Sequence, residues 1–173
     1  PGYVQYFRWI GGVLHGDFGT SMNTFRPVLS EIFNRVPITF ELAFLSLFFG
    51  TLIAVPIGAA SAIFQDSWID YVGRLLAMLA LSVPSFVIAT ALILFPSIWW
   101  GYFPPMGLAA LSKDPLQNLQ QVLPATMALG AILAGQAMRL TRSSVLEVLR
   151  SDFVRTARAK GLRDMLIIWR HVL

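Results

Sequence analysis

The 173-residue chain is 56% apolar and only 13% charged, with a mean hydropathy of +0.67. A soluble domain carries about 25% charged residues, so this composition excludes an ordinary soluble domain and favours a membrane protein. The chain contains no cysteine, which excludes disulfides and thiolate metal sites.

The first long uncharged run covers residues 42–64 and predicts a membrane span. As a helix it would be about 34 Å long, enough to cross a hydrocarbon core of about 30 Å with some tilt. Pro56 would kink this helix, which membrane helices tolerate. We place the span near residues 40–63, after an extracytoplasmic segment at residues 1–38.

A second uncharged run, residues 75–112, is too long for one span and too short for two spans with a turn. We therefore expect one helical span over residues 71–95, ending at Pro96. A loop at residues 104–107 follows an interfacial aromatic belt. The belt residues are Trp99, Trp100, Tyr102 and Phe103.

A third and weaker span is predicted at residues 121–140, which contain Pro124 and Gln136 and are closed by Arg139. The expected fold is therefore all-α, a polytopic integral membrane protein with three transmembrane helices. Residues 39–173 would form one partial transmembrane domain.

Charge is distributed very unevenly along the chain. Eight of the thirteen Lys and Arg residues lie in residues 139–173, where three acidic residues reduce the net charge to +5. The preceding residues carry five basic and six acidic side chains, a net charge of −1. Basic loops stay on the cytoplasmic side of a membrane, so we expect residues 143–173 inside and residues 1–38 outside. Because the positive charge follows the spans, we expect no nucleic-acid partner.

Small residues recur at four-residue spacing in the first and third spans and predict close helix packing. They are Gly50, Ala54, Gly58 and Ala62 in the first span, and Thr126, Gly130 and Ala134 in the third. Movement of this face during a transport cycle is compatible with the same pattern.

Three polar residues are candidates for a translocation path. Gln136 lies deep in the third span, and Ser82 and Ser85 flank Pro84. Polar residues in membrane spans are costly and often functional, but they also form hydrogen bonds between helices. Both interpretations stay open for all three residues.

The basic tail has the periodicity of two short amphipathic helices joined at Gly161. Its first apolar stripe contains Leu146, Leu149, Phe153 and Ala157. A basic helix of this kind can rest on anionic membrane lipid. It can also contact a cytoplasmic protein.

Residues 139–149 (RLTRSSVLEVL) and 152–162 (DFVRTARAKGL) closely resemble the cytoplasmic loop of bacterial ABC-importer permeases. The similarity is strongest to the dipeptide, oligopeptide and nickel permease family. In that family the loop carries a Glu-Ala-Ala, three residues, Gly signature. Arg155-Thr156-Ala157 stands in place of Glu-Ala-Ala here, as is usual for the peptide branch, and Gly161 is retained.

The resemblance extends along the chain. Residues 16–21 (GDFGTS) resemble the external segment before the family's second span, and residues 35–43 (RVPITFELA) resemble the entry to that span. Residues 100–104 (WGYFP) resemble the external loop after the third span. We therefore expect this chain to be the middle part of a six-span subunit.

This resemblance implies a multi-pass subunit of the bacterial cytoplasmic (inner) membrane that helps to transport peptides or a related small solute. Its partners would be a second, homologous permease subunit, two cytoplasmic ATPase subunits and an extracytoplasmic solute-binding protein. A coupling helix at about residues 153–161 would dock in a cleft of an ATPase. The implied docking residues are Arg155, Thr156, Ala157, Arg158, Ala159, Lys160 and Gly161.

Other functions have weaker support. No G-x-x-x-x-G-K-[ST] motif occurs, so we expect no enzymatic ATP site and no cofactor in this chain. His15 and His171 have no second ligand at metal spacing, so no metal site is expected.

An ion-gradient-driven secondary transporter would need intramembrane carboxylates or broken helices. A membrane scaffold with a lipid-binding basic tail is the remaining alternative.

Overall fold

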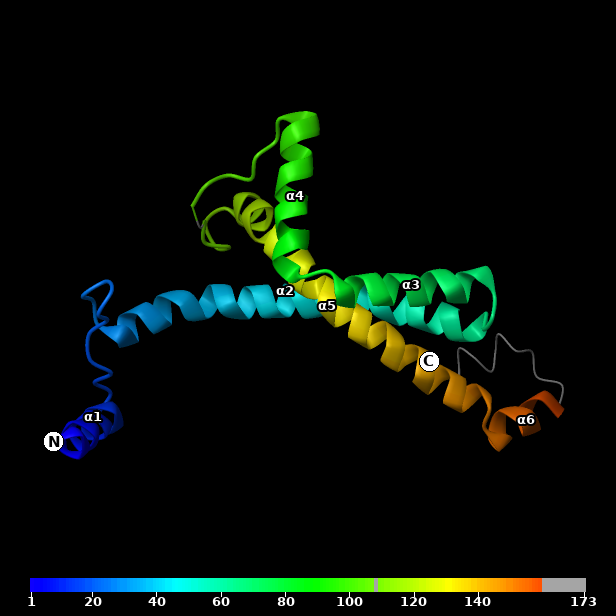
Figure 1. The fold of residues 1–173 in the computed structure, drawn as a ribbon, viewed down its shortest axis with the longest axis horizontal. Coiled ribbons are helices and arrows are strands. Elements are labelled where there is room, and N and C mark those ends of the chain that lie inside the picture. Colours follow the sequence, from blue (N-terminus) through cyan, green and yellow to red (C-terminus); the bar gives the residue numbers. More distant parts are fainter. Residues whose placement is uncertain (108, 160–173) are drawn as a thin grey trace. The chain divides into compact units, whose positions relative to one another are not determined.

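The computed structural model describes residues 1–107 and 109–159. These residues are mostly helical and contain no β-strand, only an isolated bridge between Thr20 and Pro27. The prediction of an all-α fold is confirmed. The helices are α1 (Gly2–Leu14), α2 (Val28–Ile63), α3 (Trp68–Ser82), α4 (Ser85–Trp100), α5 (Pro115–Leu149) and α6 (Asp152–Ala159), as Figure 1 shows.

The chain divides into two compact units, residues 1–43 and residues 44–173, and each is described by itself. The first unit contains α1, whose apolar and aromatic side chains are mostly exposed. A tight turn follows, in which the Gly19 amide donates to Asp17 Oδ1 at 2.9 Å. Gly16 and Gly19 have φ of +84° and +75°, values that glycine adopts without steric cost. The first turns of α2 complete this unit.

Helices α2 and α5 are long and apolar enough to cross a membrane. α2 has 36 residues and α5 has 35. Both exceed the spans predicted at residues 40–63 and 121–140, because a helix continues beyond the uncharged run wherever nothing interrupts its backbone hydrogen bonds. At the start of α5 the Asp114 carboxylate caps the helix by accepting from the Gln117 amide at 3.0 Å, and Pro115 occupies the first turn.

The prediction of one continuous helix at residues 71–95 is wrong. The structure has two helices, α3 and α4, which meet at a bend of 100° (Figure 1). Val83 is extended at φ −87° and ψ 123°, as expected for a residue before proline, and Pro84 is the N-cap residue of α4. Pro96, where the sequence predicts the end, lies inside α4, which stops at Gly101 in a left-handed conformation. The pair makes one broken span or a re-entrant segment, and with it the described residues contain two or three candidate spans.

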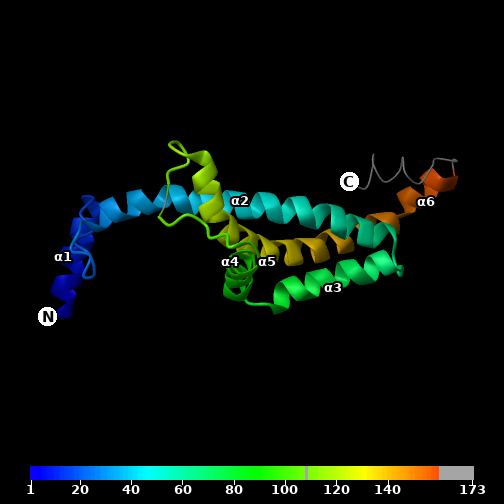
Figure 2. The same ribbon diagram turned by 90° about the horizontal axis from the view of Figure 1, so that it is seen from above.

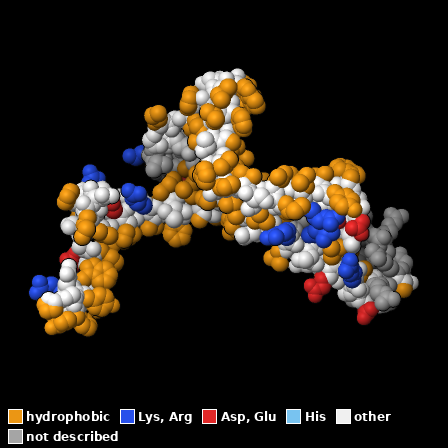
Figure 3. Space-filling model, in the orientation of Figure 1, with side chains coloured by type: hydrophobic (Ala, Val, Ile, Leu, Met, Phe, Trp, Pro, Cys, Tyr) orange, Lys and Arg blue, Asp and Glu red, His pale blue; other side chains and the backbone are white. Residues whose placement is uncertain are grey.

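In the second unit, α2, α5 and α3 pack around a core of three alanines and one methionine, and Figure 2 shows the helices side by side. This core contains Ala54, Ala77, Ala134 and Met138. Charged side chains gather where α2 turns into α3 and where α5 ends, whereas hydrophobic side chains cover α4 (Figure 3). An apolar exterior is what a protein surrounded by lipid requires.

Helix α5 continues to Leu149, so the first part of the predicted cytoplasmic loop is the end of this long helix. The chain bends at Arg150 and Ser151, and α6 then covers residues 152–159. The second predicted amphipathic helix, after Gly161, lies outside the described residues.

Candidate functional site

The predicted packing residues of the first and third spans meet in one contact between α2 and α5. Gly50, Ala54, Gly58, Ala62, Gly130 and Ala134 are all buried. A Cβ added at Gly50 would lie 3.1 Å from the carbonyl oxygen of Gly130, and one at Gly130 would lie 3.1 Å from that of Ser46. We call this contact, made by these six residues, the glycine seam.

The seam is tightest at Gly58, where an added Cβ would lie 2.7 Å from the Met138 carbonyl oxygen and 2.9 Å from Thr141 Cβ. Real Cβ atoms essentially never approach a backbone atom so closely. One polar contact crosses near its other end, where the buried Ser46 hydroxyl donates to the Thr126 carbonyl at 3.2 Å. Hardly any side-chain atoms therefore lie between the backbones of α2 and α5 at the seam.

The three translocation-path candidates lie on α3, α4 and α5, and their role stays a prediction. Ser82 and Gln136 are exposed, and Ser85 is half-buried. The serines lie on either side of the bend between α3 and α4. Gln136 is on α5 next to the buried Gly135, whose backbone packs against α3. No substrate cavity is assigned from these residues.

The candidate docking segment begins in α6. Residues 155–159 belong to this helix, with Thr156 and Ala159 exposed, while Lys160 and Gly161 lie outside the described residues. The Thr156 hydroxyl donates to the Asp152 carbonyl at 2.9 Å, a bond within α6. Val154 is completely buried against Val148 of α5, so α6 is anchored to the end of the long helix.

A cluster of charged and polar side chains close to this end was not predicted. Asp70 on α3 is 0% exposed, yet both its carboxylate oxygens accept hydrogen bonds from Arg142 of α5, Nε to Oδ1 and Nη2 to Oδ2, each at 2.8 Å. The Ser61 hydroxyl donates to Oδ1 at 2.7 Å, and the Asp66 amide donates to Oδ2 at 3.1 Å. Arg74 lies 3.3 Å from Oδ2. We call these five residues the Asp70 cluster.

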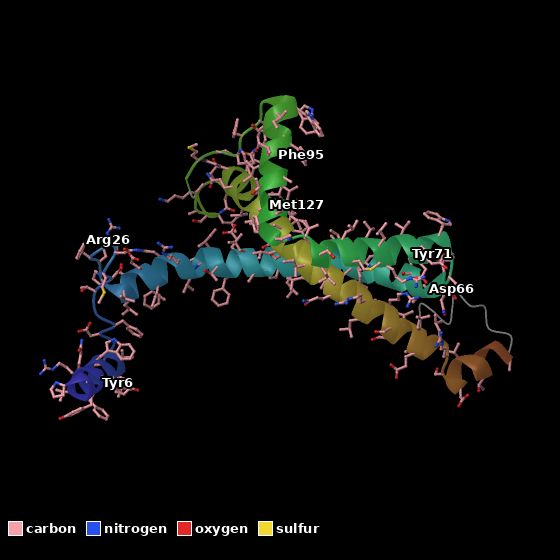
Figure 4. All side chains as sticks on the ribbon, viewed as in Figure 1. Tyr6, Arg26, Asp66, Tyr71, Phe95 and Met127 are labelled. Atoms are coloured by element: carbon pink, nitrogen blue, oxygen red, sulfur yellow. The ribbon has the colours of Figure 1, made fainter. Side chains whose placement is uncertain are left out.

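The cluster joins α2, the turn after it, α3 and α5. Figure 4 shows Asp66 and Tyr71 near each other at this end of α3, where side-chain nitrogen and oxygen atoms gather. Asp70 is in the first turn of α3, where the helix dipole also favours a negative charge. A paired carboxylate in that setting is satisfied on both oxygens, as a buried charge must be.

Sequence reasoning missed this pair because its members are 72 positions apart, and Arg142 was counted only as part of a basic tail. One signal was available. Gly73 faces Ser61, and its added Cβ would lie 2.8 Å from the Ser61 hydroxyl. Gly73 therefore lets α3 approach α2 closely, and the sequence places this glycine three residues after Asp70.

At the other end of α5, two amide side chains hold the loop before the helix. The Ala109 amide donates to Gln121 Oε1 at 2.8 Å, and Asn118 Nδ2 donates to the Ala109 carbonyl at 2.9 Å. Asn118 is almost completely buried. The loop before α5 is thus attached to this helix through the backbone N–H and carbonyl groups of Ala109.

This chain matches known transport proteins over its whole length. It is 38% identical to the glutathione transport system permease protein GsiC of Salmonella paratyphi A, over 100% of this chain and 54% of that protein. It is 37% identical to the oligopeptide transport system permease protein AppB of Bacillus subtilis, over 100% of this chain and 56% of that protein. GsiC of Pectobacterium atrosepticum is 36% identical, over 98% and 53%. The chain spans about half the length of these curated relatives.

A family model also matches residues 54–173. The matched part includes most of the glycine seam, the whole Asp70 cluster and α6. The family was expected from the loop sequence and from three further motifs along the chain, and the family model covers the loop and the helices before it. This chain therefore belongs to the binding-protein-dependent transport system inner membrane component family.

Proposed function

We propose that the chain is part of the permease subunit of an ATP-driven importer for peptides or a related small solute. The observation that carries this proposal is the similarity to glutathione and oligopeptide permease proteins over the full chain. An inner-membrane location fits the family and the exposed apolar surface of α4. Glutathione is itself a tripeptide, so both relatives point to small peptides.

The mechanism that we infer is alternating access driven by partner subunits. A solute-binding protein delivers solute outside, and α6 with the residues after it docks in a cleft of a cytoplasmic ATPase. Two ATPases and a second permease subunit complete the complex. The chain has no phosphate-binding loop motif of its own, so the proposal assigns ATP hydrolysis to the partners.

The length, position, charge and anchoring of α6 support a docking role. It is short, begins directly after a long candidate span, and includes Arg155 and Arg158 in its sequence. Val154 anchors it to α5 through a fully buried contact, so a force applied to α6 would reach the span. A helix that only rested on lipid would not require such an anchor.

A secondary transporter is the rival, and the buried Asp70 is the carboxylate that it would use. However, both oxygens of Asp70 are occupied by Arg142, Ser61 and the Asp66 amide. A proton- or ion-binding carboxylate has to exchange its partner during transport. The bidentate pair therefore favours a structural role for Asp70.

The test uses the full-length subunit with its ATPases in membrane vesicles. Ala157→Trp should overfill the docking contact, so ATPase co-purification and ATP-dependent uptake of a labelled tripeptide should fall together. Ala110→Trp, the same substitution in the exposed loop before α5, is the matched control and should change neither. Wild-type co-purification and uptake in Ala157→Trp would defeat the docking role, and uptake driven by an ion gradient without ATP would favour the rival.

A further inference from the structure

The Asp70 cluster is far more elaborate than helix packing alone requires. A buried ion pair is often no more stabilising than apolar residues of similar size, because both charges must lose their hydration. Here one carboxylate nevertheless accepts from two other helices and a turn: α2 through Ser61, the following turn through Asp66 and α5 through Arg142. What the cluster provides beyond stability is orientation.

The geometry of the Arg142 contact fixes orientation more strictly than apolar packing does. Two parallel hydrogen bonds of 2.8 Å lock the planar guanidinium against the planar carboxylate. Sliding α5 along α3, or rotating it, would break at least one of them. The glycine seam, in contrast, limits the distance between α2 and α5 but contains few groups that define their register.

The contact lies close to the proposed docking helix. Arg142 is seven residues before the end of α5, about 10 Å along the helix axis. Between the two, Val145 packs against Ala59 and Ala62 of α2. Beyond them, Val154 of α6 is buried against Val148. The described contacts thus form a continuous path from α6 through α5 to the cluster.

The far end of α3 has a different character. It ends at Ser82, and the extended Val83 and Pro84 separate it from α4 at the 100° bend. Among the described residues no backbone hydrogen bond runs from α3 into α4 across this break, so the backbone there permits the angle between α3 and α4 to change. The cluster therefore lies at one end of α3 and the break at the other, and α3 also packs closely on α5 near the break, where Gly135 faces Ala77 and Ala80.

We propose that Asp70 is a positioning residue that joins the end of α5 to α3 in one fixed register, so that movement of the docking helix α6 is passed to α3 and the bend after it. This inference rests on the proposed docking function. It predicts that the loss of the pair uncouples ATP hydrolysis from transport while the ATPases remain bound.

The experiment measures the tripeptide transported per ATP hydrolysed, in vesicles that contain the full-length complex. Asp70→Asn removes the charge and keeps the shape, and the ratio should fall about fivefold or more, the lower end of measured coupling effects. Arg142→Lys keeps the charge but loses the two-point geometry, and the ratio should fall by less. ATPase co-purification should stay at the wild-type level in both.

Arg74→Gln is the matched control. Arg74 contacts the same Asp70 oxygen, but both residues belong to α3, so this pair links no two helices. The transport-to-ATP ratio should therefore stay native in this variant. An equal drop in Arg74→Gln would overturn the proposal, because charge balance within α3 would then explain the effect.

A merely structural role predicts another outcome. In that case Asp70→Asn and Arg142→Lys would lower the amount or the melting temperature of the complex, and the surviving complex would transport with the native ratio. That result would also overturn the proposal. If Asp70→Asn does not assemble, the Arg142→Lys ratio decides alone. Failure of the docking function is recognised separately, because Ala157→Trp would then retain its ATPases.

Discussion

The glycine seam joins α2 to α5, and the ion pair of the Asp70 cluster joins α3 to the same helix α5 by opposite means. At the seam, side chains are reduced to hydrogen or methyl, and backbones come within 3.1 Å of where a Cβ would be. At the cluster, long side chains span the gap and meet in a bidentate ion pair. The seam relies on van der Waals contact, which is sensitive to volume, and the cluster relies on hydrogen bonds, which are sensitive to direction.

The seam and the cluster therefore control different properties of the helix packing. Apolar contact between small residues sets how close α2 and α5 lie, but it restricts sliding only weakly. A planar ion pair with two hydrogen bonds defines one position and one angle. Substitutions that add volume should therefore act most strongly at the seam, and substitutions that remove a partner should act most strongly at the cluster.

The largest effect is expected for Asp70→Ala. It leaves the Arg142 charge without a partner in a mostly buried site, and breaking such a pair costs about 3 kcal/mol or more. Arg142 is 23% exposed, so hydration should reduce the cost toward the lower end. Thermal unfolding of the purified full-length complex in detergent measures the change.

The double variant Asp70→Leu/Arg142→Met sharpens this prediction. It replaces both charges by apolar groups and should recover most of the stability that Asp70→Ala loses. It should not recover the transport-to-ATP ratio, because apolar groups do not define an angle. A double variant as unstable as Asp70→Ala would show that burial of the site, rather than the unpaired charge, causes the loss.

An intermediate effect is expected for Gly58→Ala. The added Cβ would lie 2.7 Å from the Met138 carbonyl oxygen, so α2 and α5 must move apart, at a cost of about 1–3 kcal/mol. Gly11→Ala is the control, because nothing lies within 4 Å of an added Cβ there. Detergent unfolding of both variants checks the difference, and equal melting temperatures would contradict the close approach.

The smallest effect is expected for Ser46→Ala, which removes the one hydroxyl bond from α2 to the Thr126 carbonyl. Hydrogen bonds between membrane helices contribute about 0.6 kcal/mol on average. The same unfolding measurement should show a shift well below that of Gly58→Ala. A larger shift would mean that the seam depends on hydrogen bonding as much as on shape.

Much of the architecture follows from the local sequence. Uncharged runs predict α2 and α5 because a membrane allows only segments whose backbone is internally hydrogen-bonded. The four-residue spacing of Gly50, Ala54 and Gly58 places them on one helix face, whatever that face contacts. The apolar and basic residues after Val145 predict helix, and α6 starts within that stretch. Family membership also follows from the loop sequence, because its signature is contiguous.

Tertiary structure decided the rest. Two prolines, Pro84 and Pro96, could each end a helix, and the sequence prediction took Pro96, yet the chain bends at Pro84 and stays helical through Pro96. The reason is that a membrane helix tolerates a lost hydrogen bond when packing holds it, and packing is not visible in a local window. The sequence analysis likewise counted Asp70 and Arg142 only toward the net charges of two separate parts of the chain. Only the packing of α3 against α5 brings their side chains within 2.8 Å of each other. The ion pair then offsets the cost of burying the Asp70 charge.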